Sequence, residues 1–161
     1  MAVDFYSSLA EAGLVELLKD ELPALFPNGE KQVTASDDTI LDNGNDYYAI
    51  AYPGNFPVID TASSFRVYDW EIQLDILARW KTNHAAAWAA FKALRSEVVY
   101  LINHTETGRS LGKTNYVRSA MIAAEDRPRY IPVRGTDENN PTFSHIGQVC
   151  IVTVTMTVPR S

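Results

Sequence analysis

The stretch Val67-Tyr-Asp-Trp-Glu-Ile-Gln-Leu-Asp-Ile-Leu-Ala-Arg-Trp80 (VYDWEIQLDILARW) alternates between large apolar side chains and acidic or polar ones. The apolar positions are Tyr68, Trp70, Ile72, Leu74 and Ile76, and the positions between them are Asp69, Glu71, Gln73 and Asp75. Successive side chains of a β-strand point to opposite faces, so this period of two predicts a strand with one apolar face and one acidic, solvated face. Such a strand belongs in an antiparallel sheet that helices cover on one side only.

Two amphipathic helices are predicted to supply that cover. Ser8-Leu-Ala-Glu11 has the capping-box pattern, in which serine and glutamate satisfy free backbone N–H groups, so we expect the first helix to begin there and to end at Pro23. Asn83 is a suitable cap for a second helix of about twenty residues. The apolar faces of the two helices hold Leu14, Leu17, Leu18 and Leu22, and Ala87, Phe91, Leu94, Val98, Leu101 and Ile102.

The remaining strands are predicted from β-prone runs at residues 47–52, 116–125 and 148–158. Residues 28–45 are rich in Asp, Asn and Gly, which indicates a loop or a weak strand. Between the last two strands, prolines at 128 and 132 keep residues 126–147 out of a sheet interior. The sequence therefore predicts one α+β domain over residues 1–161, with a mainly antiparallel β-sheet, two helices packed on one face and an extended β-hairpin arm.

Composition and charge narrow the class of protein. Hydrophobic residues make up 46% of the 161 and charged residues 21%, the balance of a folded domain. The net charge of −6 argues against a protein that binds nucleic acid over a broad surface. The only cysteine, Cys150, lies in an apolar run, so we expect a small buried hydrophobe rather than a catalytic thiol. No signal peptide or membrane span is recognisable, and a soluble cytoplasmic chain is the default expectation.

The stretch Thr107-Gly-Arg-Ser-Leu-Gly-Lys-Thr-Asn115 resembles a phosphate-binding loop. Such a loop needs four residues between its first glycine and Gly-Lys-Ser/Thr, and here only three separate Gly108 from Gly112. It also joins a strand to a following helix, whereas this stretch follows a predicted helix and precedes a predicted strand. We interpret it as a helix-to-strand connection.

No other pattern in the sequence points to catalysis. The three histidines, His84, His104 and His145, are far apart and have no metal-ligand spacing with Cys150, so each is interpreted as a surface or cap residue. The carboxylates of the alternating stretch share a face, but steps of about 7 Å along a strand keep them from converging on one ion. We therefore predict no catalytic, cofactor-binding or metal-ligating residue and no enzymatic activity.

The arm combines cations with aromatic side chains: Arg127, Arg129, Tyr130, Arg134 and Phe143. Extended chain that carries arginine and aromatic anchors is typical of contacts between subunits. The alternative is an ordinary mobile hairpin.

The order of these elements resembles the tail terminator proteins of long-tailed bacteriophages, which are close to head–tail connector and tail-completion proteins. The resemblance is carried by SLAEAGLVELLKDEL (8–22), YDWEIQLDILARW (68–80), AAWAAFKALRSEVVYLI (86–102), YVRSAMIAAEDRPRY (116–130) and GQVCIVTVTMTV (147–158). It implies a structural virion protein, assembled in the host cytoplasm, that forms a hexameric ring on the last ring of tail-tube protein. The ring would stop tube growth and present a surface for joining the head.

The resemblance also implies roles for the candidate residues. Asp69, Glu71 and Asp75 become candidates for an acidic ring face or lumen through which DNA passes without specific binding. Arg129, Tyr130 and Arg134 become candidates for contacts with a neighbouring subunit or with the tube. We expect other copies of the chain to complete the sheet edges and the arm.

Two alternative functions remain open. One is a head–tail connector or neck protein with the same fold. The other is a small cytoplasmic enzyme or ligand-binding module, which in its sharpest form binds a nucleotide through Lys113; it requires a pocket with convergent polar groups, and the sequence shows no cluster to line one.

Overall fold

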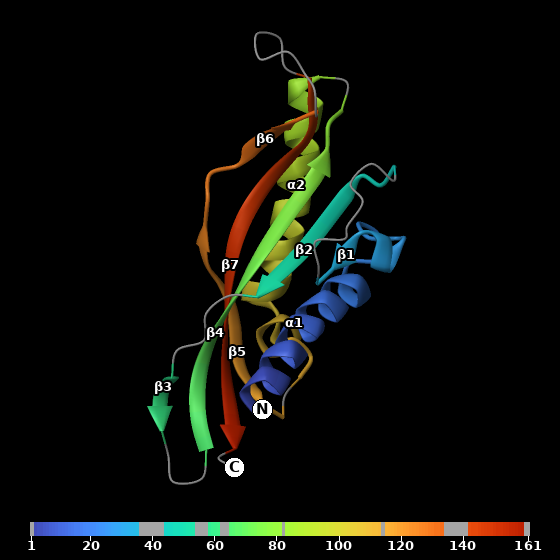
Figure 1. The fold of residues 1–161 in the computed structure, drawn as a ribbon. Helices are drawn as coiled ribbons and strands as arrows, with labels where there is room; N and C mark the ends of the chain where they lie inside the picture. The colour runs from blue at the N-terminus through green and yellow to red at the C-terminus, as the bar shows by residue number, and fades with distance from the viewer. Residues whose placement is uncertain are drawn as a thin grey trace.

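A computed structural model describes residues 2–35, 44–53, 58–61, 65–81, 83–113, 115–133 and 142–159. Within these residues the chain forms three α-helices and a seven-stranded sheet of order β1-β2-β4-β7-β5, with β3 paired to β4 and β6 to β7 (Figure 1). Every described pair is antiparallel except β1 with β2, which confirms the predicted α+β class. The strands are β1 (Val33–Thr34), β2 (Tyr47–Pro53), β3 (Val58–Thr61), β4 (Phe65–Arg79), β5 (Val117–Glu125), β6 (Arg129–Pro132) and β7 (Phe143–Pro159). The helices are α1 (Ala2–Glu21), α2 (His84–His104) and α3 (Glu106–Ser110), with a 3₁₀ turn at Gly29–Lys31.

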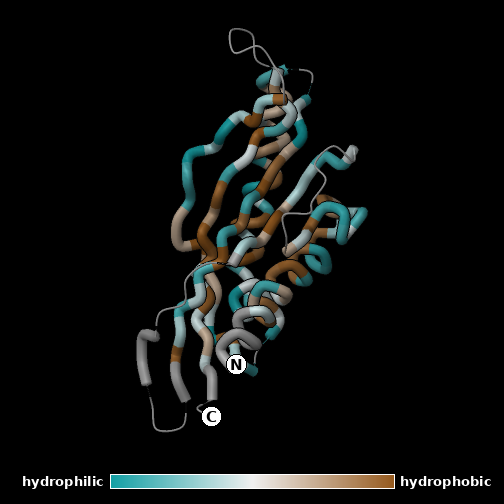
Figure 2. Tube along the Cα trace, in the orientation of Figure 1, coloured by the Kyte–Doolittle hydropathy of each residue, from teal (hydrophilic) through white to brown (hydrophobic). Residues whose placement is uncertain are grey.

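The central strand β4 confirms the predicted alternation. It pairs with β2 on one side and with β7 on the other, from Phe65↔Pro159 to Arg79↔His145. Trp70, Ile72, Leu74 and Ile76 are buried in the main core, whereas the intervening acidic and polar residues face away from the helices. Figure 2 shows the resulting alternation of hydrophobic (brown) and hydrophilic (teal) segments along the long strands.

Both long helices cover the same face of the sheet, as predicted. The Asn83 side chain accepts a hydrogen bond from the Ala86 backbone N–H at 2.9 Å, so the predicted cap of α2 is confirmed. The buried residues of α2 are the six of the predicted stripe. In Figure 1, α2 runs behind the upper half of β4 and β7, while α1 lies beside β1 and β2.

The predicted start of the first helix is wrong. α1 begins at Ala2, so Ser8 lies inside the helix and the capping box does not form. No glycine or proline interrupts residues 2–8, and serine is tolerated in a helix interior, so nothing stops the helix from extending toward the N-terminus. Glu11 Oε1 is instead a buried atom with no hydrogen-bond partner among the described residues. Burial of this carboxyl raises its pKa.

The Glu11→Gln substitution is expected to stabilise the fold slightly at neutral pH. A carboxyl whose pKa is raised on folding does not lower the stability of the fold at pH values below its unfolded pKa. The loss of stability grows as the pH rises through that value toward the folded pKa. Because Glu11 is only partly buried, the gain at pH 7 is at most about 0.5 kcal/mol. Urea denaturation at pH 7 and pH 3.5 measures it, and a gain of equal size at both pH values would contradict this account.

The predicted arm is a β-hairpin that joins the sheet. β6 pairs with the start of β7, from Arg129↔Gly147 to Pro132↔Phe143, and β5 pairs with the later part of β7. β5 and β6 therefore follow one another along the same edge of β7 (Figure 1). β7 begins at Phe143 rather than at Gln148 because β4 and β6 both pair with its first residues. The predicted tip of the hairpin, residues 135–140, lies outside the described residues.

Candidate functional site

The acidic row of β4 lies on the sheet face opposite the helices, which we call the open face. Asp69 accepts a hydrogen bond from the Thr155 hydroxyl of β7 at 2.8 Å, and Asp75 accepts one from the Gln73 side-chain amide at 3.0 Å. Glu71 between them is exposed. Among the described residues, no group of three or more His, Cys, Asp or Glu side chains could hold a metal ion. The row is therefore a line of separate carboxylates, two of which are fixed by neighbouring polar groups.

Arg129 and Asp75, which the sequence assigned to different surfaces, lie at the same place on the open face. Arg129 is in register with Gly147 on β7, and it lines a cavity of about 30 Å³ together with Asp75. Burial raises the pKa of Asp75, while the Gln73 hydrogen bond and the positive charge of Arg129 act in the opposite direction. The arm thus supplies a cation to the end of the acidic row.

The open face is not polar over its whole length, contrary to the expectation of a sheet that is apolar on one side only. Tyr48, Ile50 and Leu77 form a second buried cluster there, and Ile131 of β6 packs against it. His145 lies at this end of the sheet, edge-on to Tyr48 with ring centroids 5.6 Å apart. It is buried rather than a surface or cap residue, because β4 and β6 flank it on both sides.

The aromatic residues of the arm are fixed to the body of the protein. Tyr130 packs against Trp80 at 5.8 Å and against Phe143 at 5.3 Å between ring centroids, and its hydroxyl lies 3.1 Å from Nε2 of His84 at the start of α2. Tyr130 is still 41% exposed. Arg127 is exposed, and Arg134 lies outside the described residues. Of the arm candidates, Tyr130 and Phe143 therefore form a supported surface with an exposed aromatic residue.

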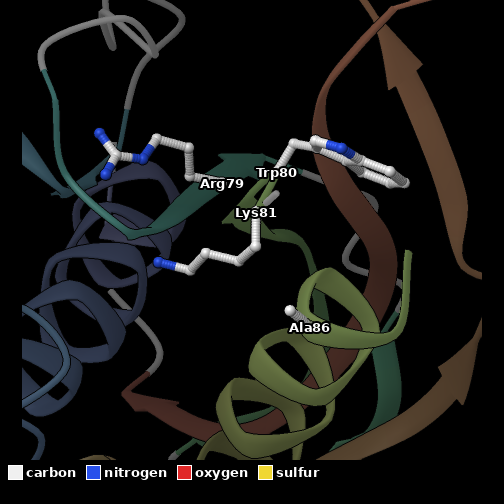
Figure 3. Close-up of a pocket in the computed structure, with 4 residues that line it drawn as sticks. All are labelled: Arg79, Trp80, Lys81 and Ala86. Atoms are coloured by element: carbon white, nitrogen blue, oxygen red, sulfur yellow. The ribbon is translucent and has the colours of Figure 1, made fainter. Parts of the chain in front are cut away.

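A hollow of about 670 Å³ next to the aromatic cluster is lined by Arg79, Trp80, Lys81 and Ala86 (Figure 3). In Figure 3, Arg79 and Lys81 extend to the side opposite the Trp80 ring. Both cations pair with Asp46, at 3.1 Å and 2.9 Å, and this pairing, led by Lys81, lowers the pKa of Asp46. The hollow consequently offers little uncompensated charge to a ligand.

A second cleft was missed by the sequence reasoning. It has a volume of about 430 Å³, lies between α2 and the β5–β6 connection, and is lined by Trp88, Phe91, Lys92, Arg95, Ser96, Pro128 and Gln148. The signal was present in α2, where the aromatic and basic residues recur at helical spacing along the flank of the buried stripe.

The apparent phosphate loop is a connection from α2 to β5, as interpreted. Its first glycine, Gly108, lies in α3, where the Thr105 hydroxyl accepts a hydrogen bond from its backbone N–H at 2.9 Å. Leu111 and Gly112 have left-handed backbones that turn the chain toward β5. Lys113 pairs with Glu16 of α1 at 3.1 Å, which raises the lysine pKa. The lysine thus tethers the connection to the first helix.

The buried thiol of Cys150 confirms the expectation of a small core residue. Burial is the largest cause that raises its pKa, to about 12, so the reactive thiolate is not populated near neutral pH.

Comparison with known proteins assigns this chain to no family. No protein-family model matches the chain, and no curated protein matches its sequence. Within the described residues, none of the helices is both long and apolar enough to cross a membrane.

Proposed function

We propose that this chain is a structural virion protein of the tail terminator kind, which assembles as a ring on the end of a phage tail tube. The observation that carries the proposal is the open sheet face. Two helices cover the other face of the same sheet, while this one presents Asp69, Glu71 and Asp75 in a row along the central strand. In a ring whose copies turn this face inward, the carboxylates would repel the phosphates of passing DNA over about 8 Å at physiological salt.

The free sheet edge supplies a means of joining copies. Within the described residues β5 ends the strand order and pairs only with β7, so its outer edge is available to another strand except at Ile122, whose backbone N–H donates to Asn103 of α2 at 2.8 Å. Met121 on β5 is 52% exposed, in register with Thr153 on the open face. An apolar side chain on an open edge favours a contact between copies along β5, with the supported arm surface around Tyr130 available to the same neighbour or to the tube.

The Met121→Glu substitution is expected to abolish ring assembly while leaving the fold intact. The wild-type chain, mixed with tail-tube protein, should give six-fold rings or capped tubes in negative-stain images, and light scattering after gel filtration should report the corresponding mass. A carboxylate buried in the contact lacks a partner, which raises the cost of association. The matched control is Tyr100→Glu, because Tyr100 is a large apolar residue that is 61% exposed and belongs to α2 rather than to β5.

Three outcomes separate the alternatives. A strict monomer with tube protein present would overturn the ring proposal. A ring that captures a portal-side adaptor rather than tube protein would instead assign the chain to the connectors. Rings formed equally well by wild type and Met121→Glu would exclude the β5 edge as the contact.

A further inference from the structure

The cleft beside α2 has an apolar wall. Trp88 and Phe91 are stacked with ring centroids 5.7 Å apart and an interplanar angle of 30°. Pro128, in the connection from β5 to β6, also lines the cleft. Two aromatic rings and a proline ring around about 430 Å³ provide space and apolar surface for one large side chain.

Gln148, whose side chain holds a buried acceptor without a partner among the described residues, also lines the cleft. Gln148 is 5% exposed, and its side-chain N–H donates to the Asp126 carbonyl at 2.7 Å, which fixes the amide group. Its Oε1 is buried and has no hydrogen-bond partner among the described residues. A buried acceptor left unpaired destabilises the protein, so an incoming N–H donor would be favoured here.

The rim of the cleft carries positive charge. Lys92 Nζ lies 5.5 Å from the centroid of the Trp88 ring and forms no ion pair with any residue that the structure describes. Arg95, one turn further along α2, is held by Glu125 of β5. Lys92 is therefore the charge available to an anionic group of a ligand, on a protein whose net charge is −6.

We propose that this cleft binds an extended acidic peptide segment of a partner protein. A large apolar side chain of the segment fills the space against Trp88, Phe91 and Pro128. A backbone N–H next to it donates to Gln148 Oε1, and a flanking carboxylate pairs with Lys92. A peptide supplies all three groups within a few residues, because side chains and N–H groups alternate along extended chain. This inference does not rest on the proposed ring function.

The test uses two synthetic peptides of opposite charge: acetyl-Glu-Leu-Glu-Phe-Glu-amide and acetyl-Lys-Leu-Lys-Phe-Lys-amide. Titration into the ¹⁵N-labelled full chain is followed by NMR, with the Trp88 indole signal assigned from Trp88→Phe. We expect the acidic peptide to shift the Trp88 indole and Gln148 side-chain signals with a Kd on the order of 100 µM. The basic peptide should bind at least about tenfold more weakly.

Two charge reversals make the test specific. Lys92→Glu should weaken binding of the acidic peptide at least about tenfold and improve binding of the basic one. Lys19→Glu, the same change on α1 away from the cleft, should leave both affinities unchanged. The proposal is overturned if neither peptide shifts these signals at millimolar concentration, or if both bind equally. It is also overturned if Lys92→Glu changes only self-association of the chain in gel filtration, since the occupant would then be a second copy.

Discussion

The Gly108→Ala variant is expected to lose about 3 kcal/mol of stability or to fail to fold. A Cβ at this position would lie 1.7 Å from the Leu101 carbonyl oxygen and 2.6 Å from its carbon, both in the backbone of α2. Alanine in a helix normally gains about 0.5–1 kcal/mol over glycine. That gain cannot compensate here, because the clash involves main chain that β4, β5 and β7 hold in place from the other side.

The control for this prediction is Gly13→Ala in α1. There the added Cβ would meet Cγ of the Lys113 side chain at 3.3 Å, a contact that a flexible side chain can relieve. Helix propensity should then decide the sign, so the variant should be neutral or slightly stabilised. Thermal unfolding followed by circular dichroism measures both variants. Equal stability of Gly108→Ala and wild type would show that α3 does not pack against α2 as described.

The parts of the fold that the sequence predicts well are those in which local period and tertiary environment agree. β4 alternates from Tyr68 to Ile76 because one face meets the helices, and α2 repeats in steps of three and four because one side meets the sheet. The Asn83 cap was predictable because the side chain bonds to a backbone group only three residues away. Each of these features is decided within a few residues of the chain.

The errors occur where a distant partner decides the structure. Nothing near His145 indicates that Tyr48 will lie against it, and nothing near Arg129 indicates Asp75. The second apolar cluster on the open face likewise joins Leu77 of β4 to residues of β2 and β6. The capping box failed for a different reason, because a local pattern that can start a helix does not oblige the helix to start there.

The candidate functional residues also divide into those that a single element places and those that distant parts of the chain bring together. The acidic row is local to β4 and could be predicted as a face, although its hydrogen bond to Thr155 could not. The peptide cleft combines residues of α2 with Pro128 and Gln148, so only the aromatic and basic flank of the helix was visible in the sequence. Surfaces built from one element are accessible to sequence reasoning, whereas surfaces built between elements require the fold.

The Ile72→Ala substitution should cost about 3–4 kcal/mol, while Glu71→Ala next to it should change stability by less than about 0.5 kcal/mol. Ile72 is 0% exposed and lies between Pro53 of β2 and Val152 of β7, so its removal leaves a cavity that paired strands on both sides cannot close. Glu71 is exposed on the open face, where alanine removes only a solvated carboxylate.

Chemical denaturation of the two variants and the wild type measures this contrast. Adjacent residues differ so widely only if the strand has one buried and one exposed face, which the acidic row requires in order to line a ring. Comparable losses from the two substitutions would show that both faces of β4 are buried, and the carboxylates would then have no open face from which to meet passing DNA.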